Sequence, residues 1–163
     1  MTSIDLDKGG RQQQIRPTYL GPSKGWIYTD EPAMIEFVME GAGAPISVGY
    51  KNGLLIPLWL IITGWSIFCD ASGTIQIDVY KVSEADYLAG TVPTVANTIT
   101  GSAVPKVTGA VAASSTTLTG WTTEIQQNDY IGFNIDSNAG VFKATIVIKC
   151  TKSVGQFSGV GHS

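Results

Sequence analysis

The longest apolar run in the sequence, LLIPLWLIITGW at residues 54–65, limits what this chain can fold into. Its most apolar part, residues 54–62, is nine residues long and contains Pro57, whereas a helix needs about 20 apolar residues to cross a bilayer. The run is therefore not a membrane anchor, and no membrane insertion is expected. Because a proline cannot donate to the ladder of a central strand, the run predicts two strands with a bend near Pro57.

Short strands separated by turn residues are also predicted elsewhere. Residues 34–40, 74–82 and 141–151 alternate apolar and polar side chains, residues 129–136 form a further strand, and no long segment has a helical period. In residues 74–82 the alternation places Gln76 and Asp78 on the outer face. Nineteen glycines and many threonines and valines also favour strands. We therefore expect an all-β fold, an antiparallel β-sandwich of jelly-roll type.

Local signals refine this expectation. Asn52-Gly53 favours a tight hairpin turn, and Ser72-Gly73 predicts another turn before the strand at 74–82. Ser83 is an N-cap residue followed by acidic residues, which predicts one helical turn at 83–87. The residues after Pro93 predict a second helical turn.

The sequence divides into three parts: an extended N-terminal arm (1–30), a β-sandwich module (31–152) and a flexible or extended C-terminal tail (153–163). The first 25 residues hold four of the basic residues and two acidic ones, so they carry +2, while the remainder carries −5 of the net −3. Apolar residues are spaced along the arm, which indicates that it lies on another surface; a solvated terminus is the alternative. The residues expected to anchor it are Arg11, Arg16, Tyr19 and Trp26.

The sequence lacks the residues that most catalytic mechanisms require. The only histidine, His162, lies in a glycine-rich tail, which argues against Ser-His-Asp and Cys-His catalysis. Cys69 and Cys150 are too few for structural zinc, and they either pair or remain free thiols. No cofactor, metal or nucleic-acid partner is expected. Glycoside hydrolysis would need two carboxylates. The candidates lie at strand ends or on polar faces, where acidic residues are common, so no enzyme is expected. These candidates are Asp70, Asp78, Asp129 and Asp136.

The apolar run also raises the question of what covers it. One face of an antiparallel sandwich sheet normally meets water, so an outer face of Leu, Trp and Ile requires cover, and a copy of the same chain is the simplest one. The residues expected at this subunit interface are Leu58, Trp59, Leu60 and Trp65. A second Thr-Gly-Trp, at 119–121, makes Trp121 a possible glycan contact, with a core or interface position as the alternative.

Five segments follow one another in a specific order and spacing: ITGW (62–65), SGTIQIDVYK (72–81), VANTITGSAVPKV (95–107), SSTTLTGWTTEI (114–125) and DYIGFNIDS (129–137). Through them the chain from about 56 to 151 resembles a module of tailed-bacteriophage structural proteins. This resemblance implies a β-sandwich virion component, a homotrimer displayed on the virion exterior. The N-terminus has no apolar stretch typical of a signal peptide, so assembly in the host cytoplasm is expected.

Three functions follow from these observations. The first is a homotrimeric capsid decoration or cement protein, anchored by its arm to the major capsid protein or another virion protein. The alternative is a receptor-binding module of a tail or head fibre, which uses residues 88–123 and Trp121 to bind a host surface glycan. The third is a polysaccharide-degrading enzyme, retained because carboxylates are present.

Overall fold

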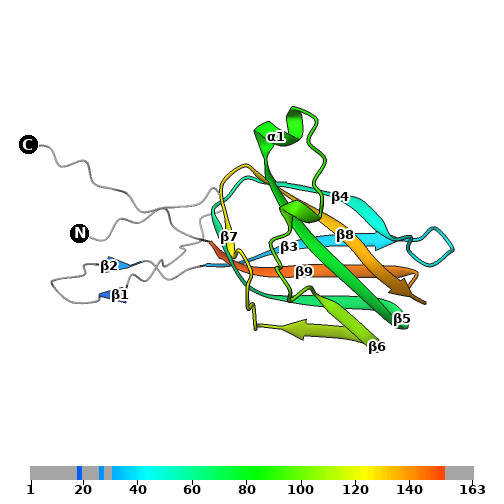
Figure 1. The fold of residues 1–163 in the computed structure, drawn as a ribbon. Coiled ribbons are helices and arrows are strands. Elements are labelled where there is room, and N and C mark those ends of the chain that lie inside the picture. The colour runs from blue at the N-terminus through cyan, green and yellow to red at the C-terminus, as the bar shows by residue number, and fades with distance from the viewer. Residues whose placement is uncertain (1–17, 20–25, 28–30, 153–163) are drawn as a thin grey trace, which may run out of the picture. The chain divides into compact units, whose positions relative to one another are not determined.

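The computed structural model describes residues 18–19, 26–27 and 31–152 of the chain. The chain divides into two compact units, Met1–Asp30 and Glu31–Ser163 (Figure 1). In the first unit, β1 (Thr18–Tyr19) pairs antiparallel with β2 (Trp26–Ile27). The sequence predicts an extended arm there but not the pairing of these four residues, because two-residue strands are too short to produce an alternating pattern.

Residues 31–152, the described part of the second unit, form one antiparallel sheet of seven strands, in the order β3-β9-β5-β8-β4, with β6 and β7 also paired to β5. The strands are β3 (Pro32–Glu40), β4 (Gly49–Ile56), β5 (Leu60–Ser83), β6 (Lys106–Ser115), β7 (Glu124–Ile125), β8 (Asp129–Ala139) and β9 (Lys143–Lys152). Two short helices follow β5: α1 (Glu84–Leu88) and the 3-10 helix η1 (Val95–Asn97). The all-β, antiparallel prediction is confirmed.

The 24-residue strand β5 joins the two halves of this sheet. Its residues 60–69 pair with β9, and its residues 74–83 pair with β8. The sheet curls at β5 (Figure 1). The rings of Phe37 on β3 and Phe133 on β8 stack 4.7 Å apart although these strands are not neighbours in the sheet. Two halves that face one core agree with a sandwich; the jelly-roll topology stays a prediction.

The core lies between these halves and consists mainly of branched aliphatic side chains. Burying one such side chain contributes roughly 1.5–3 kcal/mol, so the core supplies the main stabilisation of this unit. The predicted alternation is confirmed in β3, where Ile35 and Met39 are buried, and in β9, where Ala144 and Ile146 are buried. The largest fully buried side chains come from β5, β6, β7, β8, β9 and one loop: Phe133, Ile67, Ile75, Ile77, Ile125, Ile131, Ile135, Ile146, Ile148, Val79, Val107 and Val141.

Several local predictions can be compared with this structure. Pro57 separates β4 from β5, as expected, and Ser83 caps α1 by accepting a hydrogen bond from the Asp86 backbone N–H at 3.1 Å. The hairpin at Asn52 is wrong, because Asn52 lies inside β4 at a register shift and has a φ of 106°. Asparagine tolerates positive φ in a bulge as well as in a turn. The turn at residues 72–73 is also wrong: β5 continues through them with register shifts.

One end of the second unit contains the points where its flanking segments join. The Lys152 backbone N–H donates to the Glu31 carbonyl at 2.8 Å, and the Lys152 ammonium pairs with the Glu31 carboxylate at 2.8 Å. Leu60, the first residue of β5, is the register partner of Lys152. We call this the attachment end.

Candidate interaction surfaces

The apolar run 54–65 divides into exposed and buried residues. Leu58 and Trp59 are 45% and 42% exposed in the turn between β4 and β5, and both remain candidates for contact with another protein. Leu60 and Trp65, in contrast, are only 3% and 8% exposed and belong to the core of their own chain. Their assignment to a subunit interface is therefore corrected: a side chain buried within one subunit has no surface left for a second subunit.

Both copies of Thr-Gly-Trp need their glycine, but for different reasons. A Cβ at Gly64 would lie 2.8 Å from the carbonyl oxygen of Ser115, so glycine lets β6 approach β5 closely. Gly120 instead adopts a φ of +79°, which side chains rarely allow. The repeated motif therefore serves two local structures and does not mark a repeated site.

Trp121 is half-buried against the core. Its ring N–H donates to the carbonyl oxygen of Ala103 at 3.0 Å, and its backbone N–H donates to the Leu118 carbonyl at 3.1 Å. The indole thus joins the loops before β6 and before β7. A glycan could reach only the exposed part of the ring, and this role stays a prediction.

Two of the four arm residues predicted to anchor the protein lie among the described residues. Arg11 and Arg16 lie outside the described residues. Tyr19 and Trp26 are register partners in the pairing of β1 with β2. Their anchoring role stays a prediction.

The outer face of β5 contains a carboxylate that the sequence does not identify as buried. Asp78 is only 3% exposed, because the segment 98–100 lies beside β5 at this point. Asp78 Oδ1 accepts hydrogen bonds from the hydroxyls of Thr98 and Thr100 at 2.7 and 2.6 Å, and from the Val79 N–H at 2.7 Å. Asp78 thus lies on the outer face of β5, as the alternation predicts, but it is buried there by the segment 98–100, and its contacts indicate a structural role.

A cluster of three tyrosines covers another part of the same outer face. The rings of Tyr87, from α1, and Tyr130, from β8, stack with centroids 3.8 Å apart. The Tyr130 hydroxyl donates to Asn52 Oδ1 at 2.6 Å and accepts from the Tyr50 hydroxyl at 3.1 Å. A Cβ at Gly132 would lie 2.7 Å from the Tyr50 ring, so glycine makes room for it. This cluster fixes α1 against β4 and β8.

The raised pKa values of Tyr50 and Tyr130 exclude an acid–base function for these two residues near neutral pH. Burial first, and then hydrogen bonds with Tyr50 and Tyr87, raise the pKa of Tyr130 far above that of a free tyrosine. Burial also raises the pKa of Tyr50. The hydroxyls of Tyr50 and Tyr130 therefore stay protonated and act as neutral donors and acceptors. The sequence analysis does not identify this cluster. The one signal for it in the sequence is Gly132, a glycine between two large residues of a strand.

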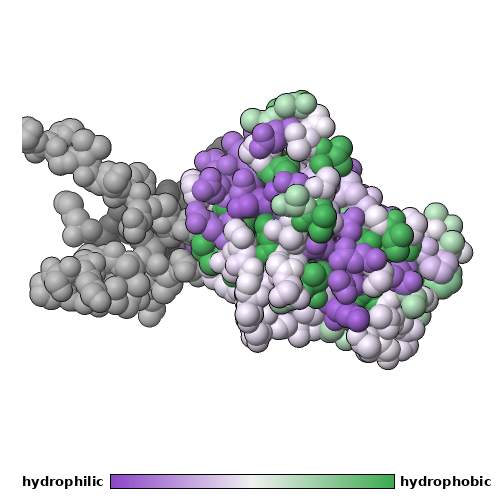
Figure 2. All heavy atoms as spheres, viewed as in Figure 1, coloured by the Kyte–Doolittle hydropathy of each residue, from purple (hydrophilic) through white to green (hydrophobic). Residues whose placement is uncertain are grey.

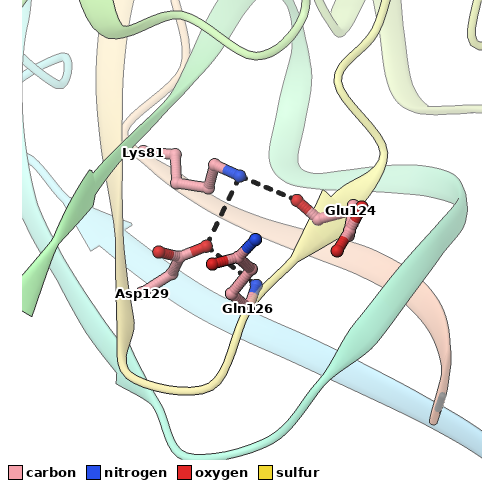
Figure 3. A network of polar contacts seen from close by, with 4 residues as sticks. All are labelled: Lys81, Glu124, Gln126 and Asp129. Carbon is pink, nitrogen blue, oxygen red and sulfur yellow. Dashed lines mark hydrogen bonds and ion pairs between the residues drawn. The ribbon is translucent and has the colours of Figure 1, made fainter. Parts of the chain in front are cut away.

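An ion pair holds the loop before β8 onto β5. The Lys81 ammonium donates to the Glu124 carbonyl oxygen at 2.8 Å and lies 3.4 Å from Asp129 Oδ2, which also accepts from the Gln126 N–H at 2.8 Å (Figure 3). The Asn128 N–H in turn donates to the Ile56 carbonyl at 2.7 Å. Oδ2 of Asp129 therefore contacts both Lys81 and Gln126, which indicates a structural role for this carboxylate.

The two cysteines are both free thiols. Cys69 is the register partner of Ala144, whereas Cys150 is the partner of Ile62, so they lie about 20 Å apart along β9 at roughly 3.3 Å per residue. A disulfide needs Cα atoms within about 7 Å, which decides between the two alternatives. Burial raises the pKa of the Cys150 thiol to about 11, so this thiol stays protonated.

The part of the chain that the structure describes contains no group of three or more His, Cys, Asp or Glu side chains able to hold a metal ion. None of the helices described in it is long and apolar enough to span a membrane. Comparison with protein-family models and with curated proteins finds no match for the chain.

Exposed apolar side chains also occur on the outer face of the half-sheet formed by β3, β9, β5 and β6. Met34 and Val38 project from β3, and Phe68 projects from β5, where it is 54% exposed. The surface seen in Figure 2 is likewise a mixture of hydrophilic, intermediate and hydrophobic patches. The sequence does not predict contacts at these residues, because only the register between the strands shows that they lie on one face.

Proposed function

We propose that this chain is a bacteriophage virion structural protein, a homotrimeric capsid decoration protein anchored by its N-terminal arm. The proposal starts from the resemblance of residues 56–151 to a phage structural module. The observation that carries it in the structure is the attachment end, where Glu31 and Lys152 are hydrogen-bonded neighbours. The segments that flank the module join it at one end, as a knob attached through one end requires.

The exposed turn at Leu58 and Trp59 supports the same proposal. Leu60 follows this turn and is paired with Lys152, so the exposed apolar side chains lie at the attachment end. Tryptophan is among the residues that contribute most to protein interfaces. A protein anchored at this end would cover these side chains by contact with the virion surface or with a neighbouring copy.

The contacts of the four carboxylates support a non-catalytic protein. Asp70 accepts from the backbone N–H groups of Phe142 and Lys143, and Asp136 accepts from the side chains of Gln76 and Asn134. Asp78 and Asp129 have the partners given above. Each carboxylate therefore has an identified role in holding the sheet or its loops.

The arm must supply many weak contacts if it is the anchor. Ordering a free segment costs on the order of 1 kcal/mol per residue, and a trimer offsets this cost by presenting three arms at once. Arg11 and Arg16 suit a carboxylate-rich surface because the guanidinium pairs bidentately.

The test compares binding to virus particles that lack this protein. A protein beginning at Glu31 should fold and still form trimers but should not bind particles, whereas the full-length chain should decorate them. Full-length protein with Arg11→Ala and Arg16→Ala is the matched control for loss of charge without loss of length, and it should bind more weakly. Equal binding of all three proteins would contradict anchoring by the arm. Copy number separates decoration from a tail organ: hundreds per virion support decoration.

A further inference from the structure

Unpaired strand edges are places where another chain can add, and most edges in residues 31–152 are protected. Proteins protect edges with proline, charged residues and bulges. The open edge of β3 carries Pro32 and Glu36, and that of β4 has the bulge near Asn52 with Lys51 beside it. The two-residue strand β7 has its Glu124 carbonyl occupied by Lys81.

The edge of β6 has none of these protections at residues 110–115. This segment, AVAASS, contains only small or aliphatic residues, and no charged residue occurs between Lys106 and Glu124. The extra residues of the neighbouring bulge belong to β5, since Phe68 pairs with Ala112 and Gly73 with Ala110. Residues 110–115 form no backbone–backbone hydrogen bond to any described residue outside β5. Half of their N–H and C=O groups therefore face outward without a main-chain partner.

An apolar row leads from this edge across the outer face of the sheet. The register places Val38, Thr145, Phe68 and Ala112 side by side on four successive strands. Val38 is 47% exposed, and Phe68 is more exposed still. In Figure 2 the surface at the lower edge of the view, where Figure 1 places β6, is largely pale, of intermediate hydropathy. We call residues 110–115 with Phe68 and Val38 the β6 surface.

We infer that the β6 surface binds a second copy of this chain, so that β6, not the run at 54–65, makes the subunit contact. This inference rests on the proposed homotrimer. A strongly charged partner would find no opposite charge on the β6 surface, whereas this chain is itself only 14% charged. The small side chains of Ala112 and Ser114 permit close approach without steric or electrostatic conflict. The uncovered main-chain groups supply the hydrogen bonds of such a contact.

The test places one positive charge on the β6 surface of the full-length protein. Ser114 and Ala112 are exposed, so Ser114→Lys and Ala112→Lys leave the core unchanged. Ala85→Lys, at an exposed position of α1, is the matched control. Light scattering over a concentration series should give trimers, three times the chain mass of 17.2 kDa, for the wild type and the control. The two β6 variants should dissociate at concentrations at least about tenfold higher than the wild type does, because the contact would have to bury the added ammonium group.

Amide hydrogen exchange of the wild type gives a second readout that needs no variant. Residues 110–115 should become more protected as concentration favours trimers. Protection that is already complete in the monomer would mean that another part of the same chain covers β6, and it would overturn the inference. Wild-type trimers that Ser114→Lys and Ala112→Lys do not weaken would overturn the inference alone. A wild type that stays monomeric at every concentration would overturn the proposed trimer as well.

Discussion

Removing the buried carboxylate of Asp78 should destabilise the second unit strongly. Asp78→Ala removes the acceptor of three hydrogen bonds of 2.6–2.7 Å, from Thr98, Thr100 and the Val79 N–H. Hydrogen bonds to a charged group contribute roughly 1.5–3 kcal/mol each, and a buried donor left without an acceptor costs about 1–3 kcal/mol. Relief of the buried charge offsets part of this loss.

The hydroxyls of Thr98 and Thr100 are 3.1 Å apart and can partly satisfy each other after the change. We therefore expect Asp78→Ala to lower the free energy of unfolding by about 3 kcal/mol, out of roughly 5–15 kcal/mol for a typical domain. Asp78→Asn should cost about 1–2 kcal/mol, because its amide oxygen still accepts from the hydroxyls but carries no charge.

Urea unfolding followed by tryptophan fluorescence measures both losses, at one fixed protein concentration because association also stabilises the folded state. Asp136→Ala is the matched control: Asp136 lies on the outer face of β8 but is exposed, so its removal should change the free energy of unfolding by only about 0.5 kcal/mol. A loss below about 1 kcal/mol for Asp78→Ala would refute the reasoning. Burial of Ile99 and the hydrogen bond from its backbone N–H to the Val79 carbonyl, at 2.9 Å, would then hold the segment 98–100 on β5.

Two further changes test surface residues named from the sequence. Leu58→Asp with Trp59→Asp should leave the fold and the trimer intact but weaken particle binding by at least about tenfold. Dissociation of the trimer, measured by light scattering, would instead place the subunit contact at the attachment end. Trp121→Ala should lower stability by about 3 kcal/mol because the indole packs on the core and binds the Ala103 carbonyl. Binding of a host glycan by the wild type and its loss in the folded variant would favour the fibre alternative.

The sequence predicted the strands whose alternation is regular. β3 and β9 each place alternate residues in the core, and their patterns predict the correct faces. The cap at Ser83 and the break at Pro57 depend on adjacent residues only. Such features follow from local chemistry, so a single sequence is enough to find them.

The interface assignment failed where alternation is interrupted. A register shift between Ile62 and Gly64 lets Ile62 and Trp65 both lie in the core although they are three positions apart. A period of two cannot place them on one face. The sequence therefore assigned Trp65 to the face that a second subunit would cover. In the structure its side chain is buried in the core and needs no such cover.

Asp78 and the tyrosine cluster failed for a different reason. Alternation placed Asp78 on the outer face correctly, but it could not indicate that residues 98–100 lie beside it. Likewise, Tyr50, Tyr87 and Tyr130 come from three separate elements. Contacts between distant segments have no period in the sequence, so only the tertiary structure reveals them.

The bulges of β5 connect these separate features. By bending at its bulges, one strand serves both halves of the sheet, and Ile67 and Ile75 enter the core although irregular pairing separates them. The residues between Phe68 and Gly73 are the ones added to β5, so β6 stays extended and meets only β5 there. The same bend that closes the core therefore leaves an uncharged edge open along 110–115. Main-chain groups along this edge are therefore left to be satisfied from outside, as a contact with another chain would do.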